Sequence, residues 1–273
     1  MNKSLNLTIL LILGHAGAAA AETRPLDCLI EPHQEVELSS AVTGIVEEVL
    51  VERGDTVAAG QVVLRLESGV EQAAVALARA RAEQEDDIRA REAQLAFAKR
   101  RLERHEQLYR TKVVSFEQRD EAQTDAVLAE MELRQARTRQ RIERLELAQA
   151  EAALARRVLK SPIDGVVVER LVAPGESVED RPLLHLARID PLNVEVIAPV
   201  ALFGTIRPGM AAEVSAEQPI GGRHRARVVI VDRVLDGASG TFGVRLELPN
   251  PDYAIPAGLH CQVRFLLDRD QAS

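Results

Sequence analysis

The feature that most limits how this chain can fold is a sequence pattern that occurs twice, 121 residues apart. The first copy reads GIVEEVLVERGDTVAAG from Gly44, and the second reads GVVVERLVAPGESVEDR from Gly165. Apolar and charged residues alternate loosely on both sides of a Gly-acid pair at Gly54 and Gly175, and glycine lets a turn take positive φ. Beyond the turn the copies align only when one residue is dropped. Each copy is therefore predicted to form strand, turn and strand, with Gly44, Gly54, Gly165 and Gly175 as structural turn glycines.

The two copies also predict how they pack. One isolated β-hairpin cannot bury its apolar face, whereas two hairpins packed face to face form a small sandwich. We therefore assign residues 22–68 to an N-terminal strand and the first half of a sandwich, and residues 158–190 to the second half. The alternative is a chance similarity between two unrelated hairpins, which the single shared offset disfavours.

The segment between the copies, residues 69–157, has a different character. It is rich in Ala, Arg, Glu, Gln and Leu, and it lacks Pro and Gly after Gly69, so it is predicted to be helical. Apolar residues recur at intervals of seven in its first part, with an eleven-residue stutter upstream, and at alternating intervals of three and four in its second part. The first series is Val70, Leu77, Ile88, Leu95, Leu102 and Tyr109, and the second is Leu128, Met131, Gln135, Thr138, Ile142, Leu145, Gln149 and Ala152.

The stretch RTKVVSFEQRD separates the two series and is predicted to be a turn. Ser115 followed by Gln118 is typical of a helix N-cap with a capping box. The middle segment is therefore a helical hairpin with arms of about 40 residues, each about 60 Å long. Its seam includes several polar residues, so the isolated hairpin is expected to be only moderately stable.

The chain after Asp190 has short β-type runs separated by Pro and Gly, as in RPGM and IPAG. This pattern predicts a small antiparallel barrel over residues 191–268, followed by a tail over 269–273. The stretch ALFGTI is predicted to be one short helix.

The first 21 residues are predicted to be a secretory signal peptide, cut after Ala21. A positive MNK, the apolar run LNLTILLILG and the small residues AGAAAAE follow one another in the expected order. The mature chain is expected to be a soluble exported protein. The alternative is an uncleaved membrane anchor.

Composition disfavours several classes of function. The formal charge is −8 and Trp is absent, which argues against a nucleic-acid partner. The six histidines are scattered without metal-ligand spacing, and no nucleophile elbow or phosphate-binding glycine loop is present. We therefore predict no catalytic residues, no metal and no cofactor, and we expect that the protein is not an enzyme.

The chain has two half-motifs, a hairpin inserted between them and a barrel after them, and the second half-motif contains LKSPIDGVVVERLVAPGESV. This order and this stretch resemble the periplasmic adaptors, or membrane fusion proteins, of the HlyD/RND efflux family. The resemblance covers about Glu35 to Leu267. It implies an elongated, multidomain α+β fold, with a long α-helical coiled-coil hairpin inserted into a lipoyl-like β-sandwich and a small antiparallel β-barrel behind it. Larger members add a membrane-proximal domain, which here is expected to be missing or reduced to the strand around Cys28 to Glu37.

The resemblance also implies a function. It predicts an adaptor that links an inner-membrane efflux transporter, with the RND type favoured, to a TolC-type outer-membrane channel. Such a protein is expected in the periplasm, peripherally associated with the inner membrane, as a homo-oligomer that forms a ring of six. An adaptor of an ABC or type I exporter is the alternative, and a lipoyl or biotinyl carrier is a further one.

The resemblance implies two sets of site residues. Family members that work with TolC-type channels share an Arg, a Leu and a Ser at the hairpin tip, and Arg104, Leu108 and Ser115 have that spacing. The alternative interpretations are that Arg104 is only a solvated charge, that Leu108 is a residue at the edge of the seam and that Ser115 is only a helix cap. Cys28 and Cys261 are predicted to form a disulfide, because export places both in an oxidising compartment and the family layout brings the N-terminal segment to the barrel. The alternative is two unpaired buried thiols.

Overall fold

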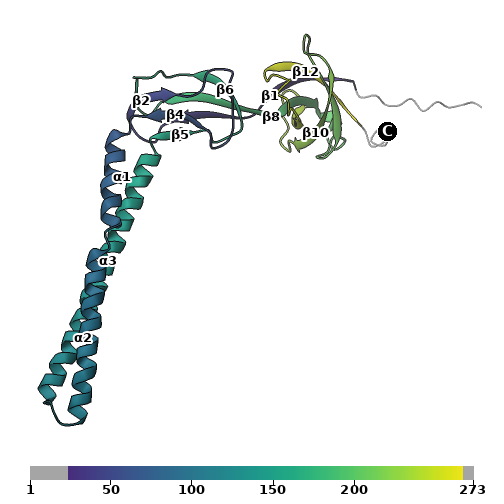
Figure 1. The fold of residues 1–273 in the computed structure, drawn as a ribbon. Coiled ribbons are helices and arrows are strands. Elements are labelled where there is room, and N and C mark those ends of the chain that lie inside the picture. The colour runs from purple at the N-terminus through teal and green to yellow at the C-terminus, as the bar shows by residue number, and fades with distance from the viewer. Residues whose placement is uncertain (1–23, 267–273) are drawn as a thin grey trace, which may run out of the picture. The chain divides into compact units, whose positions relative to one another are not determined.

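The computed structural model describes residues 24–266, so the predicted signal peptide and tail lie outside the described residues. The chain divides into two compact units, which Figure 1 shows. One comprises Gln34–Arg188, and the other comprises the described residues up to His33 together with those from Ile189 onward. Within residues 24–266, no helix is both long enough and apolar enough to span a membrane.

The first unit contains a sandwich of two sheets. One sheet has the strand order β5-β4-β2-β7, and the other layer is formed by β3, β6 and the first part of β8. The first sequence copy supplies β2 (Gly44–Val49), β3 (Thr56–Val57) and β4 (Val62–Leu66). The second supplies β6 (Gly165–Arg170), β7 (Ser177–Val178) and β8 (Pro182–Pro199), and it is preceded by β5 (Val158–Lys160).

The two copies exchange strands. Gly44 of β2 pairs with Val178 of β7, and Gly165 of β6 pairs with Val57 of β3, so a shift of 121 residues converts one pairing into the other. The turn hydrogen bonds obey the same rule, because Gly54 donates to the carbonyl of Val167 (2.9 Å) and Gly175 donates to that of Val46 (2.8 Å). The copies are thus interlocked halves that contribute to both sheets, rather than two self-contained hairpins stacked on one another.

The repeat begins earlier than Gly44. Ser40 Oγ donates to the carbonyl of Val42 at 2.6 Å, and Ser161 Oγ donates to the carbonyl of Ile163 at 2.6 Å. These residues are again 121 apart, so the same local turn precedes both halves. Both copies contribute to one shared core. Its members from the two copies are Val46, Val51, Val57, Val63, Leu64, Leu66, Val167, Val172, Val178, Leu183, Leu184 and Leu186, and Leu159 and Ile163, just before the second copy, also belong to it.

The four glycines have two different roles. Gly54 and Gly175 have φ values of 93° and 86° and form the turns, as predicted. Gly44 and Gly165 are not turn residues, because they begin β2 and β6. They are needed for close approach: a Cβ on Gly165 would lie 2.2 Å from the carbonyl oxygen of Ala187.

The inserted segment forms a helical hairpin (Figure 1), with α1 (Gly69–Ala82) and α2 (Asp86–Arg110) in one arm and α3 (Phe116–Ala155) in the other. The 40-residue length predicted for an arm matches α3. The first arm is not a single helix, because it breaks at residues 83–85. This break lies inside the eleven-residue stutter between Leu77 and Ile88, where the seven-residue spacing fails.

The predicted seam of the second arm was wrong. Leu128, Met131, Ile142 and Leu145 are at least half exposed, and they face away from α1 and α2. The side chains of α3 that are buried against the first arm are Ala122, Ala126, Ala129, Leu133 and Ala136. Ala126 and Ala129 cluster with Ala98 of α2, and Leu95 and Leu102 of α2 pack against this cluster, in keeping with the series predicted for that arm. The series does not extend to its ends, because Val70, Leu77 and Tyr109 are exposed.

Small side chains explain this seam. Alanines let two helix backbones approach closely, whereas Leu and Met at the same positions would hold them apart. Both stripes of α3 have the same alternating three-four spacing, so spacing alone does not identify which one faces the partner helix.

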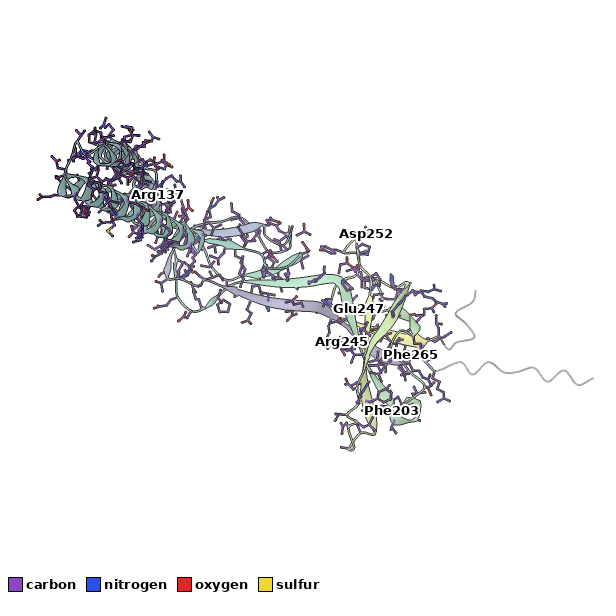
Figure 2. All side chains as sticks on the ribbon, turned by 90° about the horizontal axis from the view of Figure 1, so that it is seen from below. Arg137, Phe203, Arg245, Glu247, Asp252 and Phe265 are labelled. Carbon is purple, nitrogen blue, oxygen red and sulfur yellow. A yellow bond between two sulfur atoms is a disulfide. The ribbon has the colours of Figure 1, made fainter. Side chains whose placement is uncertain are left out.

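The second unit is a barrel of antiparallel strands. Its strand order is β1-β12-β9-β10-β11-β8, and an additional pairing of β1 with β8 joins the two ends. The short helix predicted in ALFGTI is a 3₁₀ turn over Val200–Leu202. It is followed by Phe203, which Figure 2 labels. Phe203 packs edge to face on Phe242, with ring centroids 5.3 Å apart. The remaining strands are β1 (Leu26–Ser39), β9 (Ala211–Ala216), β10 (Arg223–Val231), β11 (Thr241–Leu248) and β12 (Leu259–Phe265).

Candidate functional site

The hairpin tip is a tight turn that backbone hydrogen bonds close. Beyond the end of α2, Lys112 takes a left-handed φ of 60° and donates its N–H to the carbonyl of Tyr109 at 3.0 Å. Val113 donates to the carbonyl of Leu108 at 2.9 Å. This pair of bonds is the Schellman motif, which ends a helix by satisfying its last carbonyls.

The return helix begins at a complete capping box, as predicted. Ser115 Oγ accepts from the backbone N–H of Gln118 at 3.2 Å, and Gln118 Oε1 accepts from the N–H of Ser115 at 3.0 Å. Two of the free N–H groups at this helix end are thereby satisfied, and the backbone direction at the tip is fixed.

The structure brings the three predicted contact residues to the same end of the hairpin. Arg104 is exposed, and it forms no ion pair with any other residue between 24 and 266. Leu108, one turn further along α2, is 40% exposed. The Ser115 hydroxyl has a definite structural role as the N-cap, which does not prevent it from contacting a partner as well.

Sequence reasoning missed an aromatic and apolar surface at the tip. Val113 is 68% exposed and Phe116 is 59% exposed. Phe116 packs edge to face on Tyr109 with ring centroids 6.3 Å apart, and the guanidinium of Arg119 lies 5.8 Å from the centre of the Phe116 ring. An available signal was the stretch VVSF, which places large apolar residues where the turn predicts solvent exposure.

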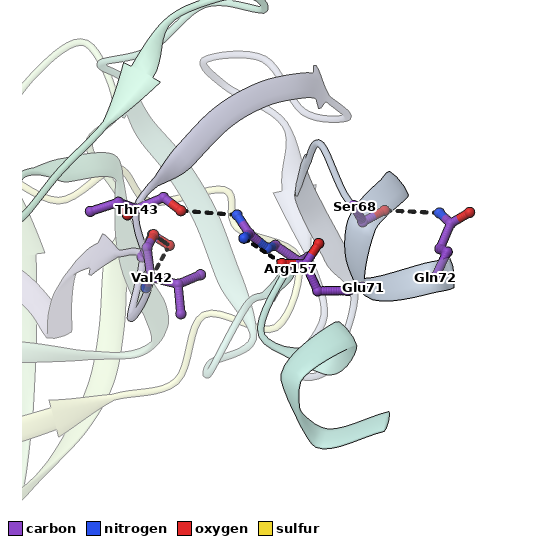
Figure 3. A network of polar contacts seen from close by, with 7 residues as sticks. Val42, Thr43, Ser68, Glu71, Gln72 and Arg157 are labelled. Carbon is purple, nitrogen blue, oxygen red and sulfur yellow. Dashed lines mark hydrogen bonds and ion pairs between the residues drawn. The ribbon is translucent and has the colours of Figure 1, made fainter. Parts of the chain in front are cut away.

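The base of the hairpin is tied to the sandwich by one arginine (Figure 3). Arg157 Nη1 donates to the carbonyl of Thr43 at 2.9 Å, and its Nη2 donates to Glu71 Oε1 at 2.5 Å. This hydrogen bond is the main cause that lowers the pKa of Glu71, with a smaller contribution from a backbone N–H. The Arg157 side chain occupies the space that a side chain on Gly44 would need, since a Cβ there would lie 2.6 Å from Nη1.

Ion pairs connect the two arms along their length. The shortest distances are 2.7 Å for Arg101–Asp125, 2.8 Å for Arg91–Glu132 and 2.8 Å for Arg137–Glu92, and Figure 2 labels Arg137. Each is at least partly exposed to solvent and is worth about 1 kcal/mol or less. Their main structural value is that they define which residues of the two arms lie level with one another.

The two cysteines lie opposite one another in the barrel. Cys28 of β1 and Cys261 of β12 are register partners, with their Cα atoms 4.8 Å apart and their sulfurs 2.12 Å apart. Between residues 24 and 266, no group of three or more His, Cys, Asp or Glu side chains is arranged to hold a metal ion. The buried polar side chains Ser161, Asn193 and Asn250 each hydrogen-bond to backbone groups, which is a structural role.

Comparison with known protein families gives two matches that together cover most of the chain. The family of the CzcB-like, barrel-sandwich hybrid domain matches residues 34–187, and the family of the CusB-like, beta-barrel domain matches residues 192–268. The first match alone spans more than half of the chain. Nodulation protein NolF of Rhizobium meliloti (strain 1021) is 26% identical over 231 residues, which are 84% of this chain and 59% of that relative. The chain thus spans less than two thirds of this relative's length.

Solved structures show the same fold. MacA from Actinobacillus actinomycetemcomitans matches with a TM-score of 0.70 and 18% identity, over 90% of this chain and 78% of that one. The membrane fusion protein Spr0693 from Streptococcus pneumoniae R6 matches with a TM-score of 0.60 and 16% identity, over 90% of this chain and 100% of that one.

Proposed function

This chain belongs to the family of membrane fusion proteins, the periplasmic adaptors, and from that premise we propose that it links an inner-membrane efflux transporter to a TolC-type outer-membrane channel. The role is non-enzymatic: the protein holds the two membrane components together in one pump. It acts in the periplasm, in peripheral association with the inner membrane. An RND-type transporter is the favoured partner.

The observation that carries this proposal is the geometry of the hairpin tip. Two capping motifs fix the backbone of the turn, so the tip presents a defined surface. Arg104 forms no ion pair with another described residue, and Leu108, one turn further along α2, and Val113 and Phe116, at the turn, expose apolar area at the same end of the hairpin. A charged group next to exposed apolar side chains on a rigid support suits a protein interface, in which Arg and aromatic residues are enriched.

One tip offers a small area, because a stable protein interface buries about 800 Å² on each partner. Several copies must therefore act together at one channel. A ring of six hairpins around a central conduit, as the family resemblance implies, supplies that area by repetition.

The test is a pair of variants at the tip, Arg104→Glu and Leu108→Asp. Both residues are exposed, so folding is expected to be unchanged by circular dichroism and by export level. Efflux and cross-linking to the outer-membrane channel are expected to fall. Arg81→Glu and Leu77→Asp are matched controls, since these residues are exposed on the same arm but away from the tip.

Full efflux by both tip variants would contradict the assignment of the contact residues. Capture of membrane partners by cross-linking from intact cells tests the rest of the proposal. Recovery of an ABC transporter in place of an RND transporter would correct the partner type and leave the adaptor role intact.

A further inference from the structure

The side of α3 that faces away from the hairpin seam carries a second stripe of residues with coiled-coil spacing. We call it the outer stripe. Its members are Leu128, Met131, Gln135, Thr138, Ile142 and Leu145. The four apolar members are 50–64% exposed. Apolar residues that repeat at alternating intervals of three and four pack into the spaces between side chains of another helix, so this surface is suited to a helical partner.

We propose that the outer stripe binds the outer stripe of a second copy of this chain, with the two α3 helices antiparallel. The stripe reads nearly the same in both directions. In an antiparallel pair centred between Gln135 and Thr138, Leu128 meets Leu145 and Met131 meets Ile142. Gln135 then meets Thr138, so two apolar layers lie on each side of a polar centre. A polar layer in such a seam fixes the register of the helices.

Other faces of the hairpin fit the outer stripe less well. The first arm exposes Val70, Leu77 and Phe97, but these lie far apart along it. In a side-by-side parallel arrangement of hairpins, residues at equal height meet. Arg144 lies within 4.0 Å of Glu85 and Arg139 within 3.6 Å of Asp87, so the height of Ile142 on the first arm is occupied by acidic residues at the helix break. The outer stripe of a second copy is an apolar surface of the same length as the outer stripe of the first.

A hydrogen bond within α3 favours the antiparallel direction. Thr138 Oγ1 donates its proton to the carbonyl of Arg134 at 2.9 Å, so this oxygen has only lone pairs left for a partner. In a parallel pair, two Thr138 hydroxyl oxygens would face each other as acceptors. In the antiparallel pair, each faces the side-chain amide of Gln135 from the other copy, which donates N–H.

Charges beside the stripe give this arrangement a distinctive signature. In an antiparallel pair, Glu132 lies near Arg139 of the other copy, an attractive contact that occurs twice. On the other flank, Arg134 lies near Arg141 of the other copy, a repulsive contact that also occurs twice. In a parallel pair, Arg141 would instead lie near Glu146. A change of charge at Arg141 therefore has opposite effects in the two arrangements.

The register has a consequence for the hairpin tip. It places Ser115 level with residue 158 of the other copy, where α3 has ended and β5 begins. The tip of each hairpin therefore lies beside the sandwich of the other copy. If the tip binds a channel as proposed above, the antiparallel dimer competes with that binding and is a resting form of the protein.

The experiment measures self-association of the full mature protein by sedimentation. Met131→Asp is expected to weaken dimer formation by more than about tenfold, because it places a charge in an apolar layer. Arg141→Glu is expected to strengthen it by roughly three- to tenfold, because both repulsive contacts become attractive. Phe97→Asp, at an exposed apolar residue outside the stripe, is the matched control and is expected to have no effect.

Cross-linking fixes the register independently of the adaptor function. When chains carrying Leu128→Cys are mixed with chains carrying Leu145→Cys, mixed dimers are expected to form on oxidation, and neither variant alone is expected to give them. Dimers of Leu128→Cys alone, or weaker association of Arg141→Glu, would overturn the antiparallel arrangement. A monomer at all concentrations, or loss of association in Phe97→Asp, would overturn the use of this surface.

Discussion

Arg157 donates a hydrogen bond to Glu71 across the base of the hairpin, with 2.5 Å between Nη2 and Oε1. About four fifths of each side chain is shielded from solvent. Glu71 is in the first turn of α1, whereas Arg157 follows the end of α3. Because Arg157 also donates to Thr43, a single side chain holds both ends of the hairpin against the sandwich.

This contact predicts a dependence of stability on pH. The hydrogen bond from Arg157 lowers the pKa of Glu71 in the folded state. A carboxylate with a lowered pKa stabilises the fold fully above its unfolded pKa, near 4.3, and loses that contribution as the pH falls through the folded pKa. The thermal midpoint is therefore expected to drop below about pH 4.3. Glu71→Gln is expected to lower the midpoint at neutral pH and to reduce the acid drop.

The control for this prediction is Glu151→Gln, which breaks the exposed ion pair with Arg79. It is expected to change the thermal midpoint little. An acid drop of the same size in Glu71→Gln and in the unaltered protein would contradict the assignment to Glu71.

Gly44 and Gly165 occupy equivalent positions in the two repeats, but we expect their substitution by alanine to lower stability by unequal amounts. Gly165→Ala pushes a Cβ into the backbone at Ala187, which cannot move without breaking the pairing of β6 with β8. Its free energy of unfolding is expected to fall by roughly 1–3 kcal/mol. Gly44→Ala meets the end of the Arg157 side chain, which can shift, so its loss is expected to be below about 1 kcal/mol. Equal losses in urea unfolding would contradict this account.

The cysteine positions predict one disulfide and no free thiol in the exported protein. Thiol counting under denaturing, non-reducing conditions is the measurement, and two free thiols would refute the prediction. A bond between Cys28 and Cys261 closes a loop of 233 residues. In the chain-entropy account, reduction lowers the free energy of unfolding by about 5 kcal/mol.

The position of the helical hairpin within the lipoyl-like sandwich predicts that the protein carries no lipoyl or biotinyl group. A carrier domain bears its modified lysine on an exposed turn that joins the two half-motifs, and here the helical hairpin occupies that joint. After residue 21 the chain has three lysines, Lys99, Lys112 and Lys160. Mass spectrometry after coexpression with lipoate and biotin ligases is expected to show an unmodified chain. A stoichiometric adduct on any of the three would favour the carrier alternative.

Local patterns allowed much of the fold to be predicted. The Gly-acid turns at Gly54 and Gly175 and the capping box at Ser115 depend on neighbouring residues, so the sequence indicates them directly. The strand exchange between the repeats could not be predicted in this way, because a strand paired within its own copy and a strand paired with the other copy have the same apolar pattern.

The seam of α3 shows a second limit. Leu128 and Met131 are the larger apolar residues, so the sequence pattern favours them over Ala126 and Ala129 as seam positions. Hydrophobicity indicates that a residue gains by burial but does not indicate what buries it. The contact residues at the tip depended on family resemblance, because exposed positions such as Arg104 leave no signature in periodicity.

The exchange of strands has a consequence for how the chain reaches its native state. The first half of the sandwich cannot complete its sheets until residues beyond 158 are present, since β2 needs β7 and β3 needs β6. Bringing together the ends of so long a segment costs conformational entropy before any stabilising contact forms, and this cost slows folding. The hairpin has local contacts and brings its own two ends together, so we expect it to fold first and to deliver the second half to the first. Substitutions in its alanine seam are then expected to slow the refolding of a sandwich that they do not touch.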